Sequence, residues 1–134
     1  MFIETASNGE ATEGPLPTHA DLMRGLPARW AQDLIDRGAL TRNDVALVIP
    51  IRTLNRRIAE AQSLTAREGD ALTRLLRLVT QAREAFDGAE AADIWLRSAN
   101  PALGGGVPIE MASTDAGARQ VEAVLVRFEA GVFG

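Results

Sequence analysis

The chain has 134 residues, of which 46% are hydrophobic and 4% aromatic, with no cysteine and a formal net charge of −4. This length suits one domain or two very small helical modules. The lack of cysteine excludes disulfide scaffolds and thiolate metal sites, and no apolar run approaches the roughly 20 residues that a membrane span needs. We therefore expect a soluble, cytoplasmic protein with an aliphatic core.

Charge is segregated along the chain. Eight arginines lie in the segment 42–83 against four acidic residues, which gives this segment a charge of +4. The segments before and after it carry −3 and −5. A basic segment between two acidic ends predicts a localised anion-binding face, although the whole chain is negatively charged.

The N-terminal residues show no periodic pattern. Residues 1–21 mix Ser, Thr, Gly, Pro and Glu, so we expect a flexible tail, with structure beginning near Leu22. His19 is the only histidine and lies in this tail, where it cannot form a metal cluster alone. Two further regions follow, a helix-turn-helix-like region over 22–63 and a helical region over 64–134.

Three short helices are predicted between Leu26 and Gln62. Gly38 can supply the left-handed end of the first helix. Thr41-Arg-Asn-Asp44 is a capping-box variant that opens the second helix, and Pro50 interrupts it. The third helix then runs from about Ile51 to Ala61.

This spacing resembles a helix-turn-helix, in which the helix after the second turn enters the DNA major groove. Arginine can bind guanine through two hydrogen bonds, and asparagine can bind adenine in the same way. The predicted DNA-binding residues are Arg42, Arg52, Thr53, Asn55, Arg56 and Arg57, and Arg67 is a further candidate phosphate contact.

Two observations keep another interpretation open for this region. Arginine is the only basic residue type besides one histidine, so arginine-rich helices can also be ordinary solvated surface. Val48 and Pro50 depart from the usual turn residues, and Ile51 would be unusual on a DNA-contacting face. Ile51 would instead suit a contact between two copies of the chain.

The residues from 64 onward predict more helices. Thr65-Ala-Arg-Glu68 is a capping box that opens a long helix with one apolar stripe, ending near Phe86. Asp87 and Glu90 open a helix that contains Trp95, which we expect in the core.

The last part of the chain contains a glycine turn and two helical segments. Asn100-Pro101 must end the preceding helix, and Gly104-Gly-Gly106 forms a turn. Pro108 starts a brief helical turn, and Thr114 caps a final long helix. No segment alternates like a β-strand, so we predict an all-α fold, with a helix-turn-helix-like bundle followed by a small helical domain.

Catalysis has little support in the sequence. The carboxylates of the C-terminal half are spread around helices, which fits solvated surface better than an acid–base pair. The glycines at 104–106 lack the Lys-Ser/Thr end and the preceding strand of a phosphate loop. We therefore expect a protein that is not an enzyme and needs no cofactor or metal.

The C-terminal half contains Trp-Leu followed by Asn-Pro-x-Leu-Gly-Gly and then Pro-x-Glu. This specific combination resembles the toxin-binding domain of the Xre/ParS/MbcA antitoxin family. The middle of the chain is similar to the family's stretch from the helix-turn-helix into the long helix, and the likeness runs from about Leu26 to the C-terminus. The matching residues are Ala92, Trp95-Leu96, Asn100-Pro101-Ala-Leu103-Gly104-Gly105, Pro108-Ile109-Glu110, Thr114, Gly117, Val121 and Gly131-Val132.

The resemblance implies a protein partner rather than a substrate. In this family the partner is a RES-domain toxin encoded by the adjacent gene, which degrades NAD or uses it to ADP-ribosylate a host protein. Such antitoxins commonly form homodimers, bind the toxin with the C-terminal domain, block its NAD pocket and repress their own operon. The alternative is a stand-alone helix-turn-helix transcription regulator whose C-terminal half only dimerises.

The last helix and the tail after it would then form the toxin-binding surface. The tail end is apolar and needs a pocket, which is either that of the toxin or the last helix turn of the chain itself. The predicted toxin-binding residues are Arg119, Glu122, Arg127, Glu129, Val132 and Phe133.

Overall fold

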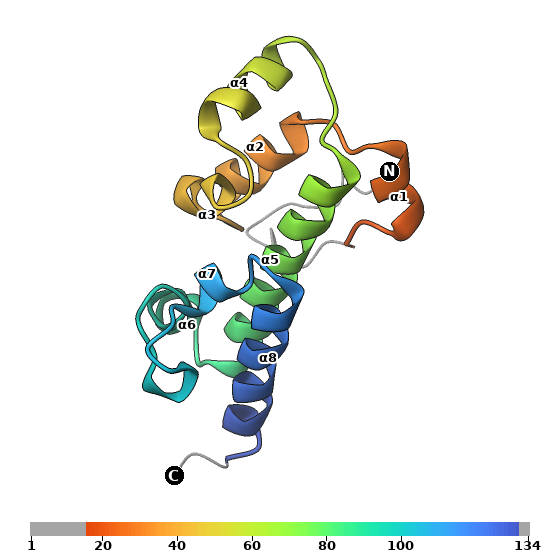
Figure 1. The fold of residues 1–134 in the computed structure, drawn as a ribbon. Coiled ribbons are helices and arrows are strands. Elements are labelled where there is room, and N and C mark those ends of the chain that lie inside the picture. The colour runs from red at the N-terminus through yellow and green to blue at the C-terminus, as the bar shows by residue number, and fades with distance from the viewer. Residues whose placement is uncertain (1–15, 132–134) are drawn as a thin grey trace. The chain divides into compact units, whose positions relative to one another are not determined.

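The computed structural model describes residues 16–131 (Figure 1). Within this range the chain is all-α, as predicted, with eight α-helices, one short 3-10 helix and no strand. No helix in the described range is long and apolar enough to cross a membrane. The elements are α1 His19–Arg24, α2 Arg29–Asp36, α3 Arg42–Ala46, α4 Ile51–Ala59, α5 Ala66–Ala85, α6 Ala89–Leu96, η1 Pro101–Leu103, α7 Pro108–Met111 and α8 Asp115–Glu129.

The chain divides into two compact units, and the division falls after Leu76, inside α5. From the sequence we placed this division after residue 63. The first half of α5 belongs to unit 1 because its residues pack there. A side-chain carbon on Gly69 of α5 would lie only 3.0 Å from Leu22 and 3.2 Å from Leu26.

The described part of unit 1 opens with a helix, within the segment for which we predicted a tail. Thr18 and Asp21 form a capping box, in which the Asp21 amide donates to the Thr18 hydroxyl at 3.2 Å and the Thr18 amide donates to the Asp21 carboxylate at 2.9 Å. The hydrogen bond from the Thr18 backbone holds the pKa of Asp21 below its ordinary value. Helix α1 therefore starts at His19, earlier than the expected start near Leu22.

Helices α2, α3 and α4 follow the predicted pattern. Gly38 takes a φ of +78° after α2, and Thr41 with Asp44 forms the predicted capping box of α3. Helix α4 begins after Pro50, as expected, and ends at Ala59, slightly before the predicted end. The large side chains that are fully buried in this unit are Leu34, Leu40, Val45, Ile49, Leu54, Leu72 and Leu75.

Two backbone hydrogen bonds join the loop before α2 to the loop before α5. The Ala28 amide donates to the Gln62 carbonyl at 2.9 Å, and the Leu64 amide donates to the Leu26 carbonyl at 2.7 Å. These bonds connect the two ends of the segment that contains α2, α3 and α4. The three short helices are thus held as one closed substructure.

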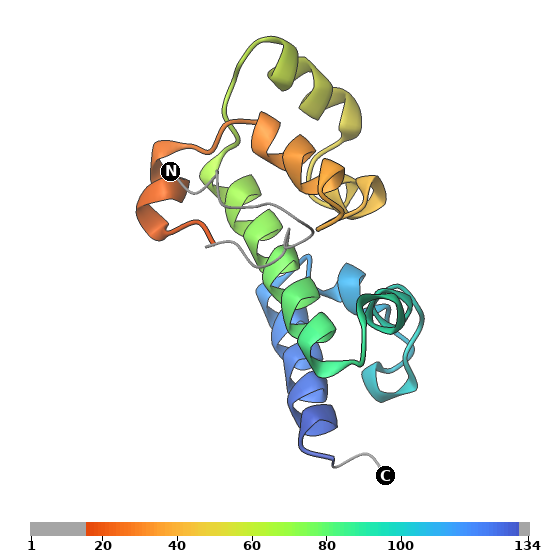
Figure 2. The same cartoon turned by 180° about the vertical axis from the view of Figure 1, so that it is seen from behind.

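Unit 2 starts at Arg77 and contains the second half of α5, α6, η1, α7 and α8. The second half of α5 and α8 lie side by side in both views (Figures 1 and 2). Helix α8 is capped as predicted, because the Thr114 hydroxyl accepts from the Gly117 amide at 3.0 Å. Helix α6 begins after Gly88 rather than at Asp87, since Gly88 has a φ of +113°.

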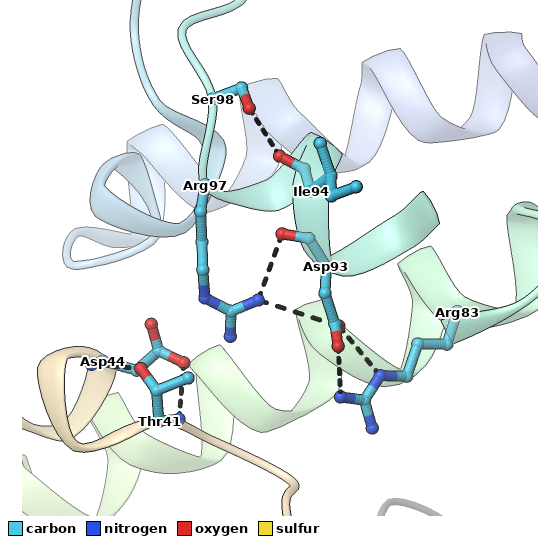
Figure 3. A network of polar contacts seen from close by, with 7 residues as sticks. All are labelled: Thr41, Asp44, Arg83, Asp93, Ile94, Arg97 and Ser98. Atoms are coloured by element: carbon cyan, nitrogen blue, oxygen red, sulfur yellow. Dashed lines mark hydrogen bonds and ion pairs between the residues drawn. The ribbon is translucent and has the colours of Figure 1, made fainter. Parts of the chain in front are cut away.

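A polar network ties α6 to the end of α5. The Asp93 carboxylate accepts two hydrogen bonds from the Arg83 guanidinium, at 3.1 and 3.0 Å (Figure 3). Arg97 donates to the Asp93 backbone carbonyl at 3.2 Å and lies 3.7 Å from its carboxylate. A two-pronged arginine–carboxylate contact has a defined geometry, so this network fixes the angle between the two helices.

Candidate functional site

The outward face of α4 is the face that the sequence predicted. Leu54 is only 1% exposed and anchors the helix to the core, while Arg52, Asn55 and Arg56 are exposed. These three residues are spaced at i, i+3 and i+4 and therefore share one side of the helix. The structure thus presents two guanidinium groups and one amide together to the solvent.

The arginines of this region differ in how strongly they are engaged. Arg52 and Arg42 are exposed and take part in no ion pair within residues 16–131. Arg56 lies 3.7 Å from the Glu60 carboxylate, but both side chains are more than half exposed, so the contact is weak. All three guanidinium groups are therefore accessible to an anion.

Arg57 lies in a different environment from its neighbours. It forms an ion pair with Glu68 of α5, and the two side chains are only 17% and 18% exposed. Burial alone would raise the pKa of Glu68, but hydrogen bonds from Arg57 and from the Thr65 backbone outweigh it and lower this pKa. Arg57 is thus placed to hold α4 against the start of α5.

The turn between α3 and α4 is apolar. Leu47 is 40% exposed, and Val48 and Ile51 are half-buried. Thr53, which we expected to contact phosphate, is half-buried on the same short helix. Apolar and basic side chains therefore adjoin at the N-terminal end of α4.

The residues predicted to bind the toxin are mostly exposed. Arg119 pairs with Asp115 at 2.8 Å, and the hydrogen bond from this pair raises the pKa of Arg119. Glu122 is half-buried and lies 3.9 Å from Arg77. Arg127 and Glu129 are exposed at the end of α8, and Val132 and Phe133 lie outside the described residues.

Three aromatic rings meet at the end of unit 2 where α5 and α8 both finish. The ring of Phe86 stacks on Phe128 with centroids 4.7 Å apart and lies 5.5 Å from the ring of Trp95. Phe128 is 41% exposed, and the other two rings are half-buried. We call this group the aromatic end. Trp95, which we expected in the core, therefore lies at its edge.

Sequence reasoning did not predict the aromatic end as a site. The sequence placed Phe86 only at the end of an apolar stripe, and its ring contacts the rings of Phe128 on α8 and Trp95 on α6. The stripes end where the helices end, so the rings at these positions stay partly uncovered. The parallel course of α5 and α8, which brings the two ends together, could not be derived from spacing along the chain.

The turn after α6 is well ordered by hydrogen bonds. The Asn100 side chain accepts from the Ala102 amide at 2.9 Å, and the Asn100 and Gly106 backbones are bridged at 3.0 Å. Gly104 and Gly105 have φ angles of +67° and +88°. Glycine adopts these positive φ angles without strain, so the glycines here allow the chain to form a tight turn. This fits the interpretation of a turn rather than a phosphate loop.

Two family models match the chain. Residues 17–79 match the antitoxin Xre-like helix-turn-helix domain, and residues 81–131 match the antitoxin Xre/MbcA/ParS C-terminal toxin-binding domain. An antitoxin Xre of Pseudomonas putida is 34% identical over 113 residues, which cover 84% of this chain and 71% of that protein. The chain belongs to the Xre/MbcA/ParS family of antitoxins.

Two further relatives carry antitoxin names. A Prs ADP-ribosylating antitoxin of a Sphingobium species is 31% identical over 97 residues, covering 66% of this antitoxin and 61% of that protein. An antitoxin Xre of Photorhabdus laumondii is 27% identical over 117 residues, covering 85% of this antitoxin and 79% of that protein. The resemblance noted in the sequence is thereby confirmed at the level of the family.

The two domain matches assign the surfaces of this antitoxin to different parts of the chain. The exposed face of α4 lies in the helix-turn-helix match. The aromatic end and the predicted residues Arg119, Glu122, Arg127 and Glu129 lie in the toxin-binding match. No group of three or more His, Cys, Asp or Glu able to hold a metal ion occurs in the described part of the chain.

Proposed function

We propose that this antitoxin neutralises a RES-domain toxin that consumes NAD, by covering the active site of the toxin with unit 2. The main support for this proposal is that residues 81–131 match a toxin-binding domain. The Sphingobium relative is named for ADP-ribosylation, a reaction that uses NAD. The antitoxin itself acts by binding, without a catalytic step.

We further propose that unit 1 binds the operator of the antitoxin's own operon. Supporting this are the exposed Arg52, Asn55 and Arg56 on one side of α4 and the exposed Arg42 on α3. Arginine and asparagine side chains on one helix face have the chemistry that reads guanine and adenine in the major groove. Arg57 plays a positioning role in this proposal because it is paired with Glu68.

We also propose that the antitoxin is a homodimer, since helix-turn-helix proteins usually bind two DNA half-sites as dimers. The apolar turn with the exposed Leu47 and half-buried Ile51 is a suitable contact next to α4. Replacing Leu47 with Ser should shift the measured mass of the purified protein toward the monomer. An unchanged mass would place the dimer contact elsewhere.

The DNA proposal is tested by replacing Arg52 and Arg56 with Ala. Each lost base contact should cost about 1–3 kcal/mol of operator binding, and each lost phosphate contact should lower the salt slope by about one. Neutralisation of the toxin should be unchanged. Replacing the exposed Arg24 and Arg29, which lie outside α4, is the matched control for loss of two positive charges.

Two results would contradict parts of this proposal. If the doubly substituted protein still binds the operator as wild type, α4 does not read DNA. If it no longer neutralises the toxin, this helix contacts the toxin instead. A wild-type protein that binds the operator but never the product of the neighbouring gene would favour the stand-alone regulator.

A further inference from the structure

Three carboxylates lie close to the aromatic rings in the chain. Asp87 follows Phe86, Glu90 lies in the first turn of α6, and Glu129 follows Phe128. All three are exposed, and within residues 16–131 none of them takes part in an ion pair or side-chain hydrogen bond. By contrast, Asp93 of the same unit is paired with Arg83.

Two helix C-termini add negative potential at this place, and the positive N-terminus of α6 offsets only part of it. The C-terminus of a helix carries about half an elementary negative charge, from carbonyl groups that have no partner in the helix. Helices α5 and α8 both end beside the aromatic rings, at Ala85 and Glu129. The aromatic end therefore combines a partly uncovered apolar centre with a negatively charged rim.

We propose that the aromatic end is the centre of the toxin contact, and that it receives an apolar side chain of the toxin that is ringed by Lys or Arg. This inference rests on the proposed function, because the residues involved lie in the toxin-binding match. Aromatic side chains in a partly desolvated setting contribute most of the energy of protein interfaces, and a charged rim steers association.

The charge of the rim favours the toxin over a second copy of the chain. Two copies packed through this end would bring two sets of the same three carboxylates together, which is unfavourable. An enzyme that binds NAD must hold two negatively charged phosphate groups, so basic side chains are expected around its pocket. The acidic rim is complementary to such a surface.

The charged residues of α8 that the sequence predicted to bind the toxin contribute less to toxin binding in this proposal than the aromatic rings do. Arg119 is already paired with Asp115, and Glu122 lies near Arg77. Such groups gain less from a partner because they have local counter-ions. Glu129 is the exception, since it carries no counter-ion in the described chain and lies next to Phe128.

Phe128→Ser, with Val126→Ser as a matched control, tests this proposal in the full chain. Val126 is 57% exposed and lies two positions earlier in α8, on the opposite side of the helix. Affinity for the RES-domain protein encoded by the adjacent gene is measured by titration calorimetry. Phe128→Ser should weaken binding by about tenfold or more, and Val126→Ser should change it by less than about twofold.

A second measurement keeps the test valid if Phe128→Ser fails to fold. The wild-type chain is labelled with 5-fluorotryptophan, which gives one ¹⁹F signal for Trp95 at the aromatic end and one for the buried Trp30 of unit 1. Adding unlabelled toxin should shift the Trp95 signal and leave the Trp30 signal in place. A Trp95 signal that does not respond to a bound toxin would overturn the proposal.

The rim is tested separately from the rings. Replacing Asp87 with Asn and Glu129 with Gln should slow association with the toxin several-fold at low salt, with little effect at high salt. Equal association rates would show that the rim does not face the toxin. If the wild-type chain binds no toxin at all, the proposed function fails; if it binds and Phe128→Ser binds equally well, only the assignment of the aromatic end fails.

Discussion

Single residues in this antitoxin show how one side chain can serve two purposes. The Glu68 carboxylate completes the capping box of α5 by accepting a hydrogen bond from the Thr65 amide at 2.9 Å, and it also forms an ion pair with Arg57 of α4. The sequence predicted the capping box from the spacing of Thr65 and Glu68. It could not predict the pair, because nothing in the spacing shows that α4 and α5 meet at this point.

Glu68→Gln is expected to destabilise unit 1 by about 1–2 kcal/mol at pH 7, through loss of the charged partner of Arg57 and a weaker cap. Urea unfolding measures this change. Glu60→Gln is the matched control, because the Glu60 contact with Arg56 is exposed and should contribute little.

The pH dependence of the same pair has a definite sign. The pKa of Glu68 is lowered in the folded chain, so its contribution to the free energy of unfolding is complete above the unfolded pKa. It is lost as the pH falls through the folded pKa. The difference in stability between wild type and Glu68→Gln should therefore shrink in acid, and a difference that grows in acid would contradict this assignment.

Gly117 is the clearest case of a residue that permits close packing. A side-chain carbon at this position would overlap the carbonyl oxygen of Met111. Gly117→Ala should therefore destabilise unit 2 by about 1–3 kcal/mol or more, as measured by thermal unfolding. Gly104→Asn is the control, since Gly104 has open space around it and a left-handed conformation that Asn tolerates.

At the scale of elements, caps and breakers predicted most of the fold. Thr41, Thr65 and Thr114 each cap a helix as their spacing indicated. Helix α1 was missed because Thr18 and Asp21 lie in a stretch whose composition is typical of a tail. The predicted DNA face of α4 could be derived because Leu54 fixes which side is buried.

Leu54 anchors α4 to the core of unit 1. Comparing its substitution with that of an exposed apolar residue shows how much this anchoring contributes to stability. Leu54→Ala should destabilise unit 1 by about 2–5 kcal/mol, because it leaves a cavity under α4. Met23→Ala, at an exposed side chain of α1, should cost about 0.5 kcal/mol or less. Chemical unfolding of both variants checks this, and equal costs would show that α4 is not anchored through Leu54.

At the scale of the whole molecule, basic and acidic surfaces are separated along one chain. The exposed arginines of α3 and α4 lie in the part that matches a helix-turn-helix domain, and the carboxylates around the aromatic end lie in the part that matches a toxin-binding domain. The sequence predicted this division through its charge pattern. The aromatic end needed the structure, because its three rings come from the turn after α5, from α6 and from α8.

The central proposal is that unit 2 silences an NAD-consuming enzyme by binding it. The most direct test is to measure NAD turnover by the purified RES-domain protein encoded next to this chain while the full antitoxin is added. We expect turnover to stop once the antitoxin is in molar excess. Undiminished NAD turnover in the presence of excess folded antitoxin would contradict the proposal.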